Sequence, residues 1–279
     1  MAVTRSAGAW DDVLIRPLKG RVAKPRQVGL TMVLDKGLGF AETRDLLEMA
    51  APYLDIYKLT FGTPAFYPGQ LLREKIALIR SYGVDVCPGG TLLEIALLQG
   101  VAEPFLERTA QLGFSCVEVS DGTISMAPAL RAWCIRKAQA LGFKVITEVG
   151  KKDPAQRMSP ESMKEVARRD LAEGAWKVIV EARESGKGVG IYDASGSVKT
   201  GELESLVEGM NEEDLIWEAP LKDQQVALIR RFGPNVNLGN VPPQDVIALE
   251  ALRAGMRADT LRDLVLANGG KLIAVGDAP

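Results

Sequence analysis

The chain has 279 residues, of which 47% are hydrophobic and 25% are charged, and this composition excludes a largely disordered or fibrous protein. Its 34 basic and 36 acidic residues give a net charge of −2, which argues against nucleic acid as a partner because phosphate backbones attract basic surfaces. The chain has no histidine, and this excludes Ser-His-Asp triads, HExxH zinc sites and imidazole acid–base catalysis.

The cysteines and the N-terminal segment bear on the cellular compartment. Cys87, Cys116 and Cys134 are far apart and form no CxxC motif, so they predict neither a zinc site nor a disulfide framework. The opening segment MAVTRSAGAWDD has no apolar signal core, and no uncharged apolar run of about 18 residues follows it. We therefore expect a cytoplasmic protein with no membrane partner.

From about residue 28 onward, short apolar runs alternate with longer amphipathic segments, which is the pattern of βα units around a parallel sheet. The predicted strands are Gly29–Leu34, Leu54–Thr60, Val84–Cys87, Cys116–Ser120, Lys144–Val149, Lys177–Glu181, Leu215–Glu218 and Val236–Leu238. The predicted helices are Glu42–Ala50, Leu71–Ser81, Leu92–Gln99, Pro104–Leu112, Ala127–Leu141, Ser159–Glu173, Leu221–Phe232 and Val246–Ala254. This α/β pattern predicts a (β/α)₈ TIM barrel, although an open doubly wound sheet fits the pattern as well.

A single barrel domain is expected at residues 28–265, after an N-terminal extension (1–27) and before a C-terminal tail (266–279). In the extension, Trp10, Val13 and Leu14 predict a short helix that covers the bottom of the barrel.

Two features lie in the loop after the sixth predicted strand. The glycine cluster Gly186–Gly190 is neither a GxGxxG fingerprint nor a P-loop, so it is either a backbone nest for an anion or a surface turn. Residues Val189–Lys199 predict a small hairpin. In a barrel this loop lies on the catalytic face.

Polar side chains gather at the carboxyl ends of the predicted strands, where a barrel builds its active site. They are Asp35, Lys36, Lys58, Glu118, Asp121, Glu148, Lys151, Lys152, Glu181, Arg183, Glu218, Asn237 and Asn240. Buried carboxylates cost several kcal/mol each unless cations accompany them. The lysines and the arginine supply some of that charge, and Mg²⁺ with oxygen ligands would supply the rest. The alternative is a salt-bridge network in the lumen without catalysis.

Three of these carboxylates predict a metal site. Glu148, Glu181 and Glu218 come from three successive strands, so they converge near the barrel axis and could bind one Mg²⁺ directly or through water. Asp121 and Asp35 are outer candidates for the same ion.

At these residues the sequence resembles the phosphosulfolactate synthase family, from about Gly29 to Thr260. The resemblance is carried by LTMVLDKG (30–37), CPGGTL (87–92), VEVSDGT (117–123), ITEVGKK (146–152), EARESGKGVG (181–190), EAPLKDQQVALI (218–229), VNLGNV (236–241) and ALRAGMRADT (251–260). Two segments depart from the family pattern: KLTFGTP (58–64) stands where the family reads close to KFGWGTS, and EARESGKG (181–188) stands for EGRESGKG. Lys58, Arg183 and Lys187 are kept through both changes.

The resemblance implies a Mg²⁺-dependent barrel enzyme that adds sulfite to C3 of phosphoenolpyruvate and forms phosphosulfolactate. In archaea this step opens a route to coenzyme M, and bacterial relatives are associated with sulfolactate formation. Attack at C3 moves electrons toward C2 and the carboxylate, and a lysine ammonium can then protonate C2. The resemblance assigns this role to Lys151, with Lys152 as the neighbouring alternative. Lys36, Lys58 and Arg183 are further catalytic candidates.

Three other expectations accompany this reading. The substrate phosphate is expected at Gly239 and Asn240, after the eighth strand, with Lys187 and Gly188 reaching from the sixth loop; a plain turn before Pro242 is the alternative. Flanking cations and partial burial are expected to lower the pKa of the proton donor. The resemblance also implies a cyclic homo-oligomer, with a trimer as the expected form.

Two other functions stay open at this point. One is related enolate chemistry with a different nucleophile or substrate, which the departure after the second strand permits. The other is a non-catalytic heat-stress-protective role, as described for related plant proteins. The retained acidic and basic groups at the strand ends argue against the second.

Overall fold

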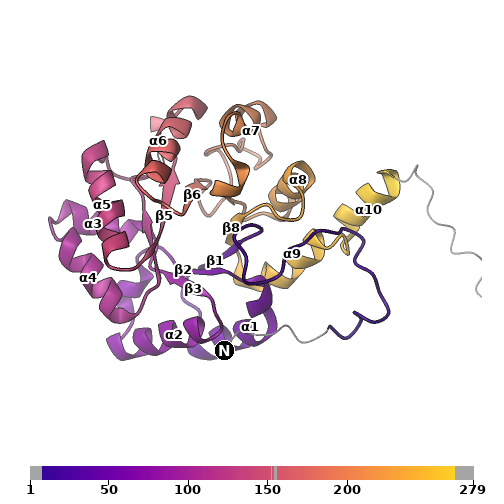
Figure 1. The fold of residues 1–279 in the computed structure, drawn as a ribbon, viewed down its shortest axis with the longest axis horizontal. Coiled ribbons are helices and arrows are strands. Elements are labelled where there is room, and N and C mark those ends of the chain that lie inside the picture. Colours follow the sequence, from indigo (N-terminus) through magenta and orange to yellow (C-terminus); the bar gives the residue numbers. More distant parts are fainter. Residues whose placement is uncertain (1–7, 152, 154–155, 268–279) are drawn as a thin grey trace, which may run out of the picture.

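The structure is a computed structural model that describes residues 8–151, 153 and 156–267 (Figure 1). Parallel strands pair in the order β3-β2-β1-β8-β7-β6-β5-β4, so that the first and last strands of the chain lie side by side. The strands are β1 (Thr31–Asp35), β2 (Ile56–Leu59), β3 (Asp85–Cys87), β4 (Cys116–Val119), β5 (Lys144–Val149), β6 (Lys177–Val180), β7 (Leu215–Glu218) and β8 (Leu238–Val241). Strands β3 and β4, at the two ends of this order, also lie in contact, so the sheet curls into a ring.

Helices surround this ring (Figure 1). They are α1 (Phe40–Ala50), α2 (Gly69–Ser81), α3 (Gly90–Leu98), α4 (Ala102–Leu112), α5 (Pro128–Ala140), α6 (Pro160–Ala172), α7 (Thr200–Val207), α8 (Lys222–Phe232), α9 (Val246–Arg253) and α10 (Ala258–Ala267), with the short 3₁₀ helix η2 (Thr63–Phe66) after β2. Helix α6 shows why a helix begins where it does. Ser159 caps the first turn by accepting a hydrogen bond from the Ser162 N–H, and Pro160 follows at the first helical position.

The seam between β3 and β4 is bridged by Ser115. Its N–H donates to the Val86 carbonyl at 3.2 Å, and its hydroxyl donates to Asp85 at 2.9 Å and accepts from the Val86 N–H at 3.0 Å. These bonds satisfy backbone groups that an open edge would leave exposed. The single-domain (β/α)₈ barrel is confirmed, and the doubly wound alternative is excluded.

Side chains alternate between the two faces of each strand, and both faces are buried. The outward side chains pack against the helices in the main hydrophobic core. The lower part of the lumen is filled by a second apolar cluster of Leu30, Met32, Ile56, Cys87, Cys116, Ile146, Ile179 and Ile216. The upper part of the lumen is therefore the part left for polar groups.

Some element bounds differ from the sequence expectation. Strand β8 begins at Leu238 rather than Val236, because the Asn237 side chain takes the place of ladder bonds: it accepts from the Leu30 N–H at 2.9 Å and donates to the Leu215 carbonyl at 2.9 Å. Helices α7 and α10 were not expected. The hairpin after β6 is present as an antiparallel bridge between Tyr192 and Val198.

The N-terminal extension differs from the predicted helix. Its described part, residues 8–27, forms a turn at Trp10–Val13 and extended segments, and Trp10 and Val13 are 66% and 67% exposed. A short helix without a buried face is unstable in water, which accounts for the difference. Residues after the turn do cross the bottom of the barrel, where Arg26 pairs with Asp55 at 2.8 Å.

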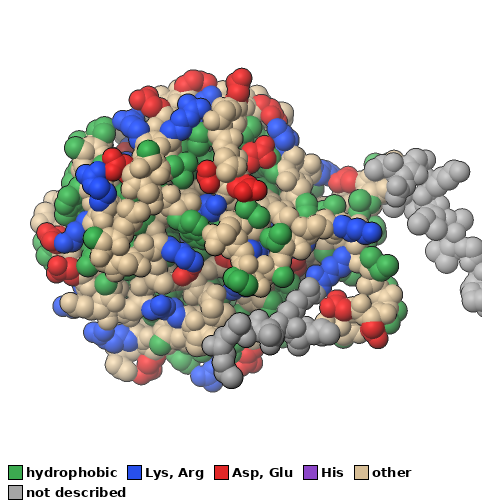
Figure 2. All heavy atoms as spheres, in the orientation of Figure 1, with side chains coloured by type: hydrophobic (Ala, Val, Ile, Leu, Met, Phe, Trp, Pro, Cys, Tyr) green, Lys and Arg blue, Asp and Glu red, His purple; other side chains and the backbone are tan. Residues whose placement is uncertain are grey.

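The outer surface carries charges of both signs. On the face drawn in Figure 2, Lys and Arg side chains are interspersed with Asp and Glu side chains. Among the described residues, every helix is too short or too polar to cross a membrane. Residues 268–279 of the predicted tail lie outside the described residues.

Candidate active site

A cavity of about 410 Å³ opens at the carboxyl end of the barrel strands. It is lined by Leu34, Lys58, Thr60, Phe61, Gly89, Gly90, Thr91, Glu118, Thr123, Glu148, Glu181, Arg183, Glu184, Ser185, Glu218 and Asn240. The charged residues of its floor stand two positions beyond the apolar residues of the lower lumen, on the same face of their strands. The strand ends thus meet where the sequence predicts an active site.

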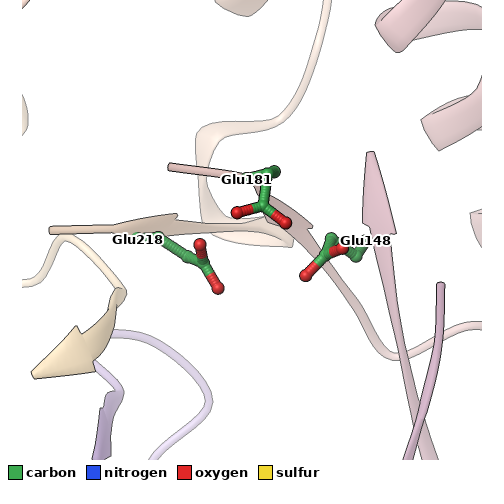
Figure 3. A group of neighbouring side chains, drawn as sticks. All are labelled: Glu148, Glu181 and Glu218. Carbon is green, nitrogen blue, oxygen red and sulfur yellow. The ribbon is translucent and has the colours of Figure 1, made fainter. Parts of the chain in front are cut away.

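Three glutamates converge in this floor, and we call Glu148, Glu181 and Glu218 the glutamate triad (Figure 3). They come from β5, from the residue after β6 and from β7, and each is 2% exposed. One carboxylate oxygen from each lies within 4.8 Å of the other two. The predicted convergence of these residues is therefore present. The all-oxygen donor set suits Mg²⁺, which favours carboxylate and water ligands.

Backbone N–H groups orient two members of the triad. The Ala182 N–H donates to Glu218 at 2.9 Å, and the Arg183 N–H donates to Glu181. On the far side of the strand, the buried Tyr192 hydroxyl donates to the Glu218 carbonyl at 2.8 Å. The two N–H bonds fix the direction of the Glu218 and Glu181 carboxylates.

Lys58 on β2 is the buried cation of the cavity floor. Its Nζ lies 2.8 Å from Glu118 and 3.5 Å from Glu218, and the side chain is 6% exposed. Burial by itself disfavours the ammonium, but the charges of Glu118, Glu218 and Glu148 outweigh it and raise the pKa of Lys58 well above its usual value. The Lys58 ammonium thus pairs with Glu118 and lies next to Glu218, a member of the glutamate triad.

Glu118 on β4 also lines the cavity. In the sequence it is one of the polar residues at strand ends, but it was not predicted to be a metal ligand or a catalytic residue. It accepts from the Gly90 N–H at 3.0 Å, at the first turn of α3. A Cβ at position 90 would lie 2.7 Å from the Glu118 carboxylate and 2.2 Å from the Ser120 hydroxyl. Glycine is therefore required for this close approach of α3 to β4.

Three cavity residues have strained backbone conformations. Phe61, Arg183 and Asn240 have positive φ angles of 57°, 61° and 52°, and among the described residues they are the non-glycine residues with positive φ. All three line the cavity. Such conformations cost about 1–3 kcal/mol each and collect at functional sites. Phe61 was not predicted as a site residue, because a single aromatic residue after a strand does not indicate a functional site.

Asn240 was expected to bind substrate, and the structure places it in the cavity wall. It is 4% exposed, and its Oδ1 has no hydrogen-bond partner among the described residues. A buried amide oxygen without a partner is costly, so a ligand in the cavity is the natural partner for it. The neighbouring Gly239 does not line the cavity: a Cβ there would lie 2.7 Å from the terminal methyl group of Met32, which fills the lumen below.

Asp35 is not part of the cavity, which corrects its place as an outer metal candidate. Its side chain is on the outward face of β1, where it pairs with Lys75 of α2 at 2.6 Å. It also accepts from the N–H groups of Gly37 and Leu38, both at 2.7 Å. Asp35 and the lumen residue Leu34 are adjacent in the strand and so point to opposite faces.

Asp121 and Lys151 form a pair beside the cavity, outside its lining. The Lys151 ammonium donates to the Asp121 carboxylate at 2.8 Å, to the Asp121 carbonyl at 2.5 Å and to the Ile124 carbonyl at 3.0 Å. Arg131 of α5 donates to the same carboxylate at 3.1 Å. Asp121 is thus committed to two cations and is not placed with the glutamate triad. Among the described residues, the groups bonded to the Lys151 ammonium are oxygen acceptors, and the expected cationic neighbour Lys152 lies outside the described residues.

The remaining predicted site residues lie at or beyond the rim. Lys36 is exposed and pairs at 2.5 Å with Glu184, which lines the cavity. Lys187 and Gly188 are exposed and are not among the lining residues. Lys152 lies outside the described residues.

The fold and the site together define a (β/α)₈-barrel enzyme, and among the described residues its cavity floor is built from carboxylates and Lys58. The profile of the (2R)-phospho-3-sulfolactate synthase (ComA) family matches residues 19–259. The chain belongs to this family, and the resemblance predicted from its motifs is confirmed.

Curated relatives match over nearly their whole length. The chain is 43% identical to the phosphosulfolactate synthase of Methanothermobacter thermautotrophicus, over 90% of this chain and 96% of the relative. It is 43% identical to that of Methanocaldococcus jannaschii, over 84% and 94%, and 37% identical to that of Bacillus subtilis, over 86% and 95%. Among solved structures, 3-hexulose-6-phosphate synthase of Salmonella typhimurium has a TM-score of 0.50 at 15% identity, over 85% of this chain and 99% of that one. That likeness shows the fold alone.

Proposed function

We propose that this enzyme catalyses the Mg²⁺-dependent addition of sulfite to phosphoenolpyruvate, giving phosphosulfolactate. The observation that carries the proposal is the glutamate triad beside the buried Lys58, in the cavity of a chain of this family. The triad would hold Mg²⁺, which when bound neutralises the negative charge that develops on the substrate carboxylate.

The residues of the chain would divide the remaining tasks. Arg183, exposed at the rim, offers a guanidinium to an incoming anion. The Asn240 side chain and Thr91, in the first turn of α3, would contact the substrate phosphate. Lys58 stays protonated throughout and supplies fixed positive charge at the floor.

Lys151 is the proposed proton donor to C2. Its ammonium is held by the 121–124 segment, and Thr123 of the same segment lines the cavity. A change of side-chain rotamer would carry the ammonium from the Asp121 carboxylate to the cavity, where it would protonate C2 after sulfite has added to C3. Asp121 and Arg131 would thus store the donor between turnovers as a positioning pair.

The direct test is to incubate the purified protein with phosphoenolpyruvate, sulfite and Mg²⁺ and to detect the sulfonate by mass spectrometry. Matched reactions leave out sulfite, or contain excess chelator. The proposal requires a product that carries both the phosphate and the sulfonate in the complete mixture. Full turnover in excess chelator would contradict the metal part, and an absent sulfonate would contradict the nucleophile.

A further inference from the structure

The apolar part of the cavity rim is small and contains an unusual residue. Among the lining residues, Leu34 and Phe61 carry the large apolar side chains, and Leu34 is 6% exposed whereas Phe61 is 49% exposed. Phe61 therefore stands where the polar cavity meets solvent. It also lies in the segment KLTFGTP, which departs from the family pattern noted above.

The loop around Phe61 holds it in place. The Thr60 N–H donates to the Asp35 carbonyl at 3.0 Å, and the Thr63 side chain and N–H both donate to the Thr60 carbonyl, at 2.8 and 3.0 Å. Gly62 also has a positive φ, of 70°, and Pro64 lies in the first turn of η2. A left-handed backbone at a phenylalanine is unfavourable, so the bonded residues on both sides impose it.

Two nucleophiles can add to phosphoenolpyruvate in an aqueous sulfite solution: sulfite and water. When sulfite adds, its sulfur lone pair forms the C3–S bond, the C2=C3 electron pair moves toward C2 and the carboxylate, and C2 takes a proton. When water adds, a C3–O bond forms, the water gives a proton to a cavity carboxylate, and C2 again takes a proton, which yields 2-phosphoglycerate. Both reactions use the same metal site and the same proton donor, so the cavity wall must discriminate between the nucleophiles.

We propose that Phe61 is a specificity-determining residue, whose ring covers the cavity mouth and excludes water from C3 while sulfite adds. This proposal rests on the proposed function. The ring lowers the number of waters that can reach C3, and the nearby Arg183 gives the sulfite dianion a contact that neutral water does not need. The strained backbone is retained because it presents a large apolar side chain at a rim that is otherwise polar.

The experiment measures the ratio of 2-phosphoglycerate to sulfonate formed from phosphoenolpyruvate and sulfite, by mass spectrometry. The variants are Phe61→Ala, Phe61→Tyr and, as a matched control, Phe66→Ala, which removes an 87% exposed phenylalanine of the same loop that does not line the cavity. The ratio is expected to rise about ten-fold or more in Phe61→Ala, the scale on which pocket shape discriminates between substrates. Phe61→Tyr, which keeps the ring, and Phe66→Ala should keep the wild-type ratio.

Two results would overturn the proposal: an unchanged ratio in Phe61→Ala, or an equal rise in Phe66→Ala. Folding is checked by comparing Phe61→Gly with Phe61→Ala, since glycine accommodates a positive φ and its variant should melt at the higher temperature. If the wild-type protein makes no sulfonate, the proposed function fails first, and that outcome differs from a wild-type protein that makes sulfonate with a ratio insensitive to position 61.

Discussion

Replacing Lys58 by Met tests whether the cavity floor is a metal site. The change keeps most of the side-chain volume and removes the ammonium that lies 2.8 Å from Glu118 and 3.5 Å from Glu218. Removing one partner of a buried ion pair costs about 3–5 kcal/mol, because the remaining charge is left uncompensated. For a chain of this size the melting temperature should fall on the order of 10 °C in metal-free buffer.

The pH dependence has a defined sign. Because the pKa of Lys58 is raised in the folded state, its contribution to stability is complete below the unfolded pKa of about 10.4 and is lost only as the pH rises through the folded value. The loss on substitution should therefore be constant between pH 6 and pH 9, a window in which this lysine stays charged in both states.

Mg²⁺ distinguishes a metal site from a simple ion-pair network. Without the ammonium, the same carboxylates present more negative charge to a divalent ion, so Mg²⁺ should bind more tightly and restore more stability in Lys58→Met than in the wild type. The assay is thermal unfolding across a Mg²⁺ titration, and it needs no substrate.

Lys75→Met is the matched control for that experiment. Lys75 is buried against a buried carboxylate, Asp35, at 2.6 Å, but on the outer face of the barrel. It should lose comparable stability without gaining a larger Mg²⁺ response. Equal Mg²⁺ responses in the wild type and in both variants would refute the assignment of a metal to this cavity.

Three other outcomes are expected. Glutamine at any member of the glutamate triad should weaken Mg²⁺ binding at least about ten-fold by calorimetry, whereas Glu184→Gln at the exposed rim should leave it unchanged. Lys151→Met should lower kcat by about 10²–10⁴ with little effect on phosphoenolpyruvate binding; if Lys152→Met has that effect instead, the two roles are exchanged, and if neither does, the lysine-acid mechanism is wrong. Light scattering should show a homo-oligomer, and a monomer at working concentration would remove that proposal.

The barrel could be predicted because its strands are short, apolar and separated by amphipathic helices. Strands β5 and β7 have the predicted bounds, Lys144–Val149 and Leu215–Glu218. Helix α7 could not be found in the same way. Its eight residues, Thr200–Val207, include a glycine and are too few to form a stable helix alone. It is stabilised by burial of Leu203, Leu206 and Val207 against the rest of the barrel.

The candidate site could be predicted in part, and the limit has a geometric cause. Alternation shows which side chains of a strand share a face, but both faces of a barrel strand are buried, so the apolar pattern does not mark the lumen. For this reason Asp35 was grouped with the lumen although it faces α2. The convergence of the glutamate triad was predicted because its members stand at the carboxyl ends of three successive strands. In the structure each member lies two residues beyond an isoleucine that fills the lumen.

Residues beyond the strand ends are harder, since alternation stops where the strand stops. Lys151 follows β5 by two residues, and its direction depends on oxygen acceptors in the loop after β4, which no local pattern reveals. The conformations of Phe61 and Arg183 are likewise set by loop contacts. Propensity alone would assign both residues a negative φ.

The lower lumen and the cavity are two layers of the same strands, and this arrangement determines where water can be excluded. The paired positions are Ile56 and Lys58, Cys116 and Glu118, Ile146 and Glu148, Ile179 and Glu181, and Ile216 and Glu218. Residues two apart in a strand are separated by roughly 6.6 Å along its axis, so the apolar layer lies directly beneath the charged one. Its close packing seals the floor and contributes the burial energy that offsets desolvation of the carboxylates above. With the floor sealed, the exclusion of water depends on the rim, where Phe61 and Arg183 are exposed and have strained backbone conformations.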